Sequence, residues 1–294
     1  MYSSEPFDYA RAGSWEEAVR LLEHGGEDAR PIAGGQSLVP MMMLRLAAPS
    51  MLVDLCDAAE RTVSVSGEEL VLSALVRHAD LESSEAVRDH CPMLAEAASQ
   101  IGNVRVRRRG TIGGSLAHGE PTAELATVAV AQRAIVRTLG PAGERSIPAG
   151  ELIVGHLTTC LEPAELITEV RIPISGSRQG SCFLEIARRA GDFALAEAAA
   201  SVTLGDDGRC EAARVVVGAV SHRPLDVSEG AARLLGEVLT EPAIREVAAA
   251  VAAEVQIGPH THASEEYRRT LTNVLVSRAL WTAARRAMNG SGLP

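Results

Sequence analysis

AGGQSL at residues 33–38 and TIGGSLAH at residues 111–118 are the segments that decide the fold of this 294-residue chain. Each segment places two adjacent glycines shortly before a serine and a leucine. Glycine lets the backbone adopt a positive φ and approach a ligand closely, and successive N–H groups in such a loop form a concave anion site. Two such loops that face each other are predicted to hold a pyrophosphate group.

The alternative for each loop is an ordinary turn without a ligand, because a glycine pair is common in turns. The repetition of the pattern favours the binding interpretation. The sequence contains no GxGxxG segment, so the usual Rossmann dinucleotide loop is not supported, and it contains no GxSxG nucleophile elbow. All 28 basic residues are arginine, which excludes a P-loop lysine and a lysine Schiff base.

The composition is that of a folded chain without a metal or nucleic-acid site of its own. Apolar residues make up 46% of the sequence, and the net charge of -10 disfavours binding to nucleic-acid phosphates. The five cysteines are dispersed and form no CxxC pair, so no zinc or iron–sulfur site is expected. His260-Thr261-His262 is interpreted as a loop because no third ligand lies nearby in the sequence. Neither a signal peptide nor a transmembrane segment is expected.

Hydrophobic periodicity predicts helices mixed with strands along the whole chain. Helices are expected at residues 15–23, 37–46, 80–87, 91–101, 123–131, 224–235, 242–255 and 265–288. Strands are expected at residues 30–33, 51–55, 62–66, 69–74, 134–139, 166–172, 182–187, 198–204 and 214–220. The Ser/Gly-rich stretch 173–180 is the predicted domain boundary, so we expect an α+β protein with domains at residues 1–176 and 177–294.

An arginine run precedes the second glycine loop. If the segment is extended, alternation places Arg105, Arg107 and Arg109 on one side. A solvated or partner-facing edge is the favoured interpretation, and direct contact of one arginine with a phosphate is the alternative.

Five segments together resemble the medium, FAD-binding subunits of the molybdenum hydroxylases, the family of xanthine dehydrogenase and carbon monoxide dehydrogenase. AGGQSLVPMMMLRL at 33–46, with LVDL at 52–55, is similar to the first FAD signature of that family, and IGNVRVRRRGTIGGSLAHGEPTAE at 101–124 is similar to the second. RRAGDFA at 188–194 matches a third loop. VVVGAVSHRPL at 215–225 and YRRTL at 267–271 resemble the C-terminal domain.

The resemblance implies a vanillyl-alcohol-oxidase-type (PCMH-type) FAD-binding domain of two α/β subdomains, at about residues 1–57 and 58–176. It further implies a C-terminal α+β domain with a three-stranded antiparallel sheet and helices. Because the similar segments follow one another in register, the resemblance covers nearly the whole chain.

In function, the resemblance implies the FAD-containing electron-transfer subunit of a heterotrimeric oxidoreductase, arranged as a dimer of heterotrimers. A large subunit would carry molybdopterin and hydroxylate the substrate, as in carbon monoxide dehydrogenase or the N-heterocycle and aromatic hydroxylases. A small subunit would carry two [2Fe–2S] clusters, and the external electron acceptor would be a quinone, O2 or NAD. The implied location is cytoplasmic, free or at the inner membrane face through the complex. A stand-alone FAD oxidoreductase and an FAD-free scaffold subunit stay open as alternatives.

Carried over position by position, the resemblance implies FAD contacts from both glycine loops and from four further segments. These residues are Ala33, Gly34, Gly35, Gln36, Ser37, Leu38, Thr111, Ile112, Gly113, Gly114, Ser115, His118, Glu124, Leu166, Ile167, Asp192 and Phe193. No catalytic group beyond the flavin and no metal ligand is expected in this chain. Three departures from the usual motif are Arg108 in place of an amide, Glu120 in place of an aspartate, and Phe193 where some relatives have tyrosine.

Overall fold

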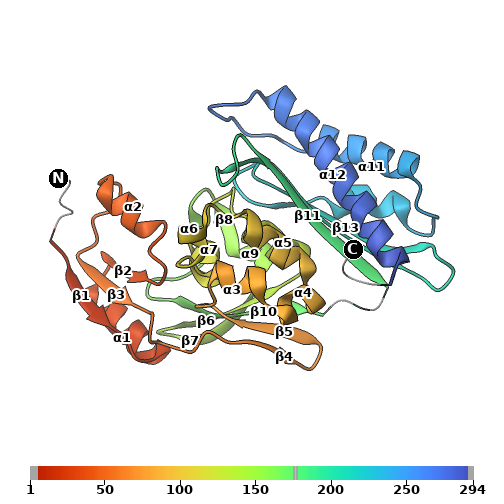
Figure 1. The fold of residues 1–294 in the computed structure, drawn as a ribbon. Helices are drawn as coiled ribbons and strands as arrows, with labels where there is room; N and C mark the ends of the chain where they lie inside the picture. The colour runs from red at the N-terminus through yellow and green to blue at the C-terminus, as the bar shows by residue number, and fades with distance from the viewer. Residues whose placement is uncertain (1–5, 175, 177, 291–294) are drawn as a thin grey trace.

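A small parallel sheet opens the computed structural model, which describes residues 6–174, 176 and 178–290. Its strands are β1 (Asp8–Arg11), β2 (Ala29–Ile32) and β3 (Met51–Asp54), in the order β1-β3-β2. Parallel neighbours need crossover connections, and α1 (Trp15–Gly25) and α2 (Leu38–Met43) lie in these crossovers. Helix α1 begins at Ser14, whose hydroxyl accepts the N–H of Glu17 at 3.1 Å. This subdomain lies at one end of the molecule (Figure 1).

A five-stranded antiparallel sheet with helices over it forms the middle of the chain. Its strands, in spatial order, are β4 (Val63–Ser66), β5 (Glu69–Ser73), β10 (Leu166–Pro173), β6 (Ile135–Gly140) and β7 (Gly143–Pro148). The helices are α3 (His78–Ser83), α4 (Glu85–His90), α5 (Pro92–Gln100), α6 (Val104–Arg107), α7 (Ile112–His118), α8 (Glu124–Ala131) and α9 (Ala149–Leu152). A two-stranded hairpin follows, made of β8 (Ile153–Gly155) and β9 (Thr158–Thr159).

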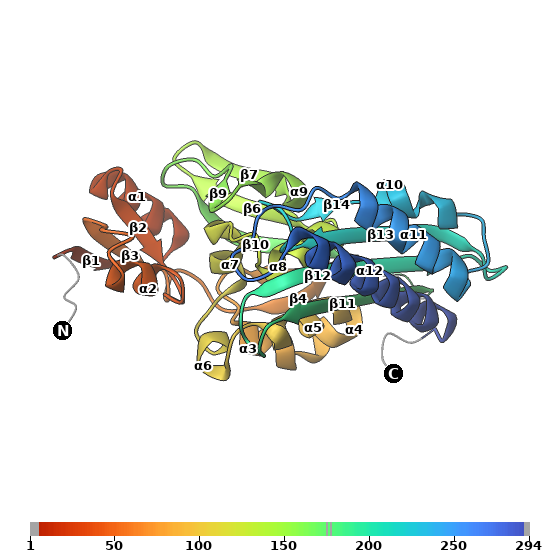
Figure 2. The same ribbon diagram turned by 90° about the horizontal axis from the view of Figure 1, so that it is seen from above.

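The C-terminal part is an antiparallel sheet covered by two long helices. Its strands are β11 (Gln179–Ala187), β12 (Ala194–Leu204), β13 (Cys210–Gly218) and β14 (Leu225–Asp226). After α10 (Ser228–Ala231) and the 3-10 turn η1 (Ala232–Leu234) come α11 (Glu241–Glu254) and α12 (Glu265–Met288). Helix α12 packs along β11 and β12 (Figure 2), while α5 and α8 of the middle part contact the same sheet.

Three of the predicted helices differ from those observed. The helix expected at 37–46 ends at Met43 because Arg45 adopts a left-handed φ of 59 degrees. The helix expected at 80–87 is divided at Ser84, whose hydroxyl caps α4 by accepting the N–H of Val87. The helix expected at 224–235 starts only at Ser228, because Leu225 and Asp226 pair with β13 and add a fourth strand to the expected three.

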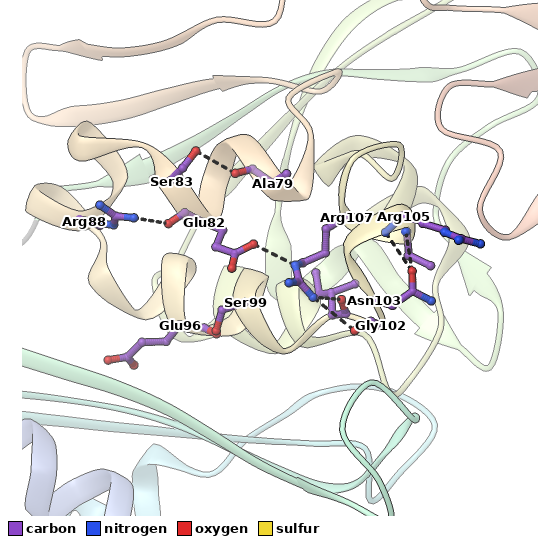
Figure 3. A network of polar contacts seen from close by, with 12 residues as sticks. Ala79, Glu82, Ser83, Arg88, Glu96, Ser99, Gly102, Asn103, Arg105 and Arg107 are labelled. Atoms are coloured by element: carbon purple, nitrogen blue, oxygen red, sulfur yellow. Dashed lines mark hydrogen bonds and ion pairs between the residues drawn. The ribbon is translucent and has the colours of Figure 1, made fainter.

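The arginine run is helical where we expected an extended segment. Asn103 caps α6 by accepting the N–H groups of Arg105 and Val106 at 2.9 and 3.3 Å. Arg107 forms an ion pair with Glu82 at 2.8 Å and donates to the carbonyl groups that precede α6 (Figure 3). The network therefore anchors this loop to α3, and Arg107 is not part of a solvated edge.

Candidate functional site

A cavity of about 880 Å³ lies where the two glycine loops meet. Small-molecule sites typically have volumes of about 300–1,000 Å³. The first loop follows β2, the second leads into α7, and residues 188–193 enter from the connection between β11 and β12. The cavity is therefore built from all three parts of the chain.

Most of the predicted cofactor residues line this cavity. They are Ala33, Gly34, Gly35, Gln36, Ser37, Leu38, Thr111, Gly114, Ser115, His118, Glu124, Asp192 and Phe193. The structure places the other four elsewhere. Ile112 is buried in the apolar core, while Gly113, Leu166 and Ile167 line a second cavity of about 680 Å³. The two cavities share Ala33, Thr111 and Gly114, so they meet at the glycine loops.

The two loops touch each other through a glycine. A Cβ on Gly34 would overlap the carbonyl group of Arg109, directly before the second loop. The Arg77 guanidinium donates to that same carbonyl and fixes its position. Because backbone cannot shift as a side-chain tip does, only glycine at position 34 allows this contact.

The first loop presents a row of free N–H groups. In the described part of the chain, none of the N–H groups of residues 34–38 donates to a protein acceptor. Gly35 has a φ of 68 degrees, and the Gln36 side chain donates to the Gly34 carbonyl at 3.0 Å, which holds the turn. Ser37 makes no capping bond, so its hydroxyl is also uncommitted. Free N–H groups that point into one turn can together hold an anion.

The second loop does not offer the free N–H groups that we expected. Ile112 donates to Val76 at 3.1 Å and Gly113 donates to Ala74 at 2.9 Å. Thr111 accepts the N–H of Gly114 through its hydroxyl and the N–H of Ser115 through its carbonyl. Gly114, which has no side chain, and Ser115 are the residues of the GGS segment that line the cavity. The two loops look alike in sequence but have different roles.

His78 is a site residue that the sequence analysis missed. Its side chain lines the cavity, yet both ring nitrogens are buried and have no hydrogen-bond partner among the described residues. A Cβ on Gly110 would lie 2.6 Å from the ring, so the backbone before the second loop passes directly over the imidazole. Burial, opposed by the Thr111 backbone and aided by Arg77 and Arg107, lowers the pKa of His78 to about 4, and the ring is therefore neutral at pH 7.

The far wall of the cavity carries charge and an exposed aromatic ring. Glu124 is the first residue of α8, and burial raises its pKa to about 8. Arg188 and Asp192 form an ion pair at 3.8 Å, and the Phe193 side chain beside them is 73% exposed. A Cβ on Gly191 would lie 2.7 Å from the Gly102 carbonyl, so this loop closes against the segment that Arg107 anchors.

Other lining residues lie outside the two glycine segments. Arg30 and Glu120 are close to them in sequence, whereas Leu157, His260 and His262 are far from them. Among the residues that the structure describes, no three potential ligands could hold a metal ion, and the His262 N–H donates to Nδ1 of His260 at 3.1 Å. Both histidines lie in the connection between α11 and α12, and their place at the cavity was not foreseen because no local signal encodes it. No helix within the described ranges is long and apolar enough to span a membrane.

Comparison with known proteins places the chain in a family. Residues 5–175 match the FAD binding domain in molybdopterin dehydrogenase, and residues 181–283 match the CO dehydrogenase flavoprotein C-terminal domain. The chain is 40% identical to the 6-hydroxypseudooxynicotine dehydrogenase complex subunit alpha of Paenarthrobacter nicotinovorans, covering 96% of this chain and 95% of that one. It is 34% identical to the carbon monoxide dehydrogenase medium chain of Afipia carboxidovorans, covering 96% and 98%.

A solved structure agrees with this assignment. Carbon monoxide dehydrogenase from Hydrogenophaga pseudoflava superposes with a TM-score of 0.92 at 34% identity, covering 97% of this chain and 99% of that chain. The resemblance stated from the sequence is thereby confirmed, as is the fold class. The chain belongs to the FAD-binding medium subunits of the molybdenum hydroxylase family.

Proposed function

We propose that this chain binds one FAD at the glycine loops and passes electrons from the [2Fe–2S] clusters of a small partner subunit to an external acceptor. The free N–H row of residues 34–38 carries this proposal, since it is a ready site for a diphosphate. Hydrogen bonds from such N–H groups to a charged acceptor contribute about 1.5–3 kcal/mol each. Bound FAD supplies the redox chemistry, and the protein supplies orientation and electrostatics.

The residues present fit an FAD in two further respects. The orphaned nitrogens of His78 need a polar partner, which a ligand in the cavity would provide. The bare backbone at Gly114, where the two cavities meet, leaves room for a group that continues from one cavity into the other. The diphosphate would lie at this junction, and the apolar wall of Leu166 and Ile167 would receive one end of the nucleotide.

The proposal divides the chain into a FAD-binding domain at residues 1–176 and a C-terminal domain at 177–294. Within the first, the subdomains are about 1–57 and 58–176. Three separate apolar clusters, one centred in each part, support this division.

The partners in this proposal are a large molybdopterin subunit, where a substrate is hydroxylated, and a small iron–sulfur subunit, in a cytoplasmic dimer of heterotrimers. Relatives support the class of complex, because one is named as a subunit of a dehydrogenase complex and others as carbon monoxide dehydrogenase medium chains. The substrate class would be carbon monoxide or an N-heterocyclic or aromatic compound, and the acceptor a quinone, O2 or NAD.

Flavin titration of the purified chain tests the site. We expect one FAD to bind per chain, and the quenching of flavin fluorescence measures this binding. In Gly114→Asp a carboxylate enters the junction and a Cβ lies 2.8 Å from Thr111 Oγ1, so FAD affinity should fall at least about tenfold. Gly150→Asp is the matched control, because a Cβ there meets nothing within 4 Å. Equal affinity of the two variants would contradict the site, and a wild-type chain that binds no FAD would support the scaffold alternative.

Co-expression with the neighbouring subunits tests the electron-transfer role. We expect substrate oxidation only by the assembled complex. Oxidation of an organic substrate by the isolated, flavin-loaded chain would overturn this part of the proposal in favour of a stand-alone oxidoreductase.

A further inference from the structure

Three glutamates from three elements converge behind the cavity wall. Glu185 on β11 and Glu197 on β12 are directly opposite each other in the antiparallel register, and such pairs have side chains on the same face of the sheet. Thr127 contacts Glu197 Oε2 at 2.6 Å and lies one helical turn after Glu124 on α8. The helix therefore brings Glu124, which lines the cavity, to the same place as the two sheet carboxyl groups.

The neighbouring strand leaves space for this group of side chains. Gly218 on β13 is the residue opposite Glu197. A Cβ at this position would overlap both Thr127 Oγ1 and Glu197 Oε2. The glycine thus makes room for a contact between polar groups of the FAD-binding part and the C-terminal part.

Two of the carboxyl oxygens here have no hydrogen-bond partner among the described residues. Glu197 is 0% exposed, and its Oε1 has no partner; Oε2 of Glu185 is also buried and unpartnered within the described residues. None of the arginines in those residues forms an ion pair with Glu124, Glu185 or Glu197. The fourth titratable group that faces them is Glu120, in the loop before α8, which is also acidic. Several unpaired negative charges in one apolar region are too costly to coexist.

Protonation is the remaining way to remove this charge. Burial and the mutual repulsion of the carboxylates raise the pKa of Glu197 well above its ordinary value. Burial alone raises the pKa of Glu185 to about 7. The charge of Glu185 raises the pKa of Glu124, and the charges of both raise the pKa of Glu197, so the protons held by Glu124 and Glu197 depend on their neighbours.

We propose that Glu124, Glu185 and Glu197 form a proton-holding site, which keeps at least one proton at neutral pH and exchanges it with the cavity through Glu124. When a negative charge enters the cavity, ionised Glu124 becomes less favourable and the site takes up a proton from solvent. The protein gains that proton and one positive charge, and no covalent bond of the ligand changes. This link to the cavity rests on the proposed function, because FAD is the anionic ligand.

Infrared spectroscopy of the flavin-free chain tests the proton itself. We expect wild-type protein at pH 7 to show the carbonyl stretching band of a protonated, buried carboxylic acid. Glu197→Gln should diminish this band, while Glu246→Gln, on the exposed face of α11, should leave it unchanged. Absence of the band in the wild-type protein would overturn the proposal, whether or not any variant folds.

Calorimetric titration with FAD at pH 8, repeated in buffers of different ionisation enthalpy, tests the link to the cavity. We expect uptake of a fraction of one proton per FAD, lost or reduced at least about twofold in Glu197→Gln. FAD binding without proton uptake in the wild-type chain would refute the link and leave the proposed function standing. A chain that binds no FAD would contradict the proposed function, while the infrared band would still decide whether the proton is held.

Discussion

Adjacent glycines in this protein serve different purposes, which their neighbours decide. Gly34 permits contact between the two loops, and Gly35 adopts a left-handed backbone. Gly113 packs so closely against Ala74 that a Cβ on Gly113 would lie 2.5 Å from the Ala74 Cβ. Only Gly114 exposes bare backbone to both cavities. A double-glycine motif therefore does not by itself say which N–H groups face the ligand.

We expect Gly34→Ala to separate the two loops, because its Cβ would overlap the Arg109 carbonyl and backbone must move. The cost in the free energy of unfolding should be roughly 1–3 kcal/mol, and FAD affinity should fall at least about tenfold. Urea unfolding and flavin fluorescence titration measure the two effects. Gly150→Ala, in open space on the short helix α9, should lower neither quantity, and a Gly34→Ala chain with wild-type stability would show that the loops are not in contact.

His78 has the signature of a residue kept for a ligand and not for the fold. Replacing a side chain that has two orphaned nitrogens by an apolar one removes a desolvation cost. We therefore expect His78→Leu to unfold at the same or a higher denaturant concentration without FAD. Its FAD affinity should fall roughly 2- to 10-fold, the value of about one lost neutral hydrogen bond. A variant that loses stability but keeps its FAD affinity would show that the imidazole has a structural role.

At the level of elements, one buried arginine joins the closing helix to the C-terminal sheet. Arg268 on α12 is 2% exposed and has no carboxylate partner among the described residues. Its guanidinium donates to the carbonyls of Leu195 at 2.9 Å, Gly258 at 2.8 Å and Ala219. Leu195 is the second residue of β12, Ala219 directly follows β13, and Gly258 lies between α11 and α12, so a single side chain joins three separate segments.

Arg268→Met should destabilise the chain by roughly 2–5 kcal/mol, because buried carbonyl groups lose their donor. Arg278→Met changes the same helix at an exposed position and should alter the free energy of unfolding by less than about 0.5 kcal/mol. Thermal or urea unfolding separates the two variants. Equal stability would mean that water satisfies these carbonyls as well as the guanidinium does.

At the scale of the whole molecule, the two halves meet through an apolar core that ends in polar groups at the cavity. Leu125 and Val128 of α8 belong to the same buried cluster as Phe183, Ala199 and Val216 of the C-terminal sheet. Glu124 and Thr127, on the same helix, meet Glu197 at the border of this cluster. The pH at which the protein is studied should therefore affect how firmly the two parts are joined.

The pH dependence of stability follows from the raised carboxyl pKa values. Burial moves the pKa of Glu124 from 4.5 to about 8, so the folded chain binds more protons than the unfolded chain between these values. Stability is then greatest below the unfolded pKa and falls as pH rises toward 8. We expect wild-type protein to lose stability from about pH 5 to pH 8, by up to about 1.4 kcal/mol per pH unit for each proton concerned.

Urea unfolding at several pH values checks this prediction. Glu197→Gln should flatten the slope and be the more stable protein at pH 8, since it removes a buried carboxyl group whose raised pKa makes the folded chain bind an extra proton. The free energy of unfolding of Glu246→Gln should depend on pH in the same way as that of the wild-type protein. Parallel curves for all three proteins would mean that the carboxyl cluster does not titrate in this range.

Sequence alone determined the two loops, the absence of lysine, most helices and strands, and through motif resemblance the FAD family. These are local properties, since periodicity, turn chemistry and short motifs are written in neighbouring residues. It missed short strands such as β7 and β14, whose pairing depends on partners elsewhere in the chain. Only the tertiary structure decided that the N–H groups of the first loop stay free while Val76 and Ala74 accept those of the second. The tertiary structure also decided that the His78 ring is buried at the cavity and that Glu124 lies near Glu197. Burial and hydrogen bonding of a side chain depend on segments brought together by folding.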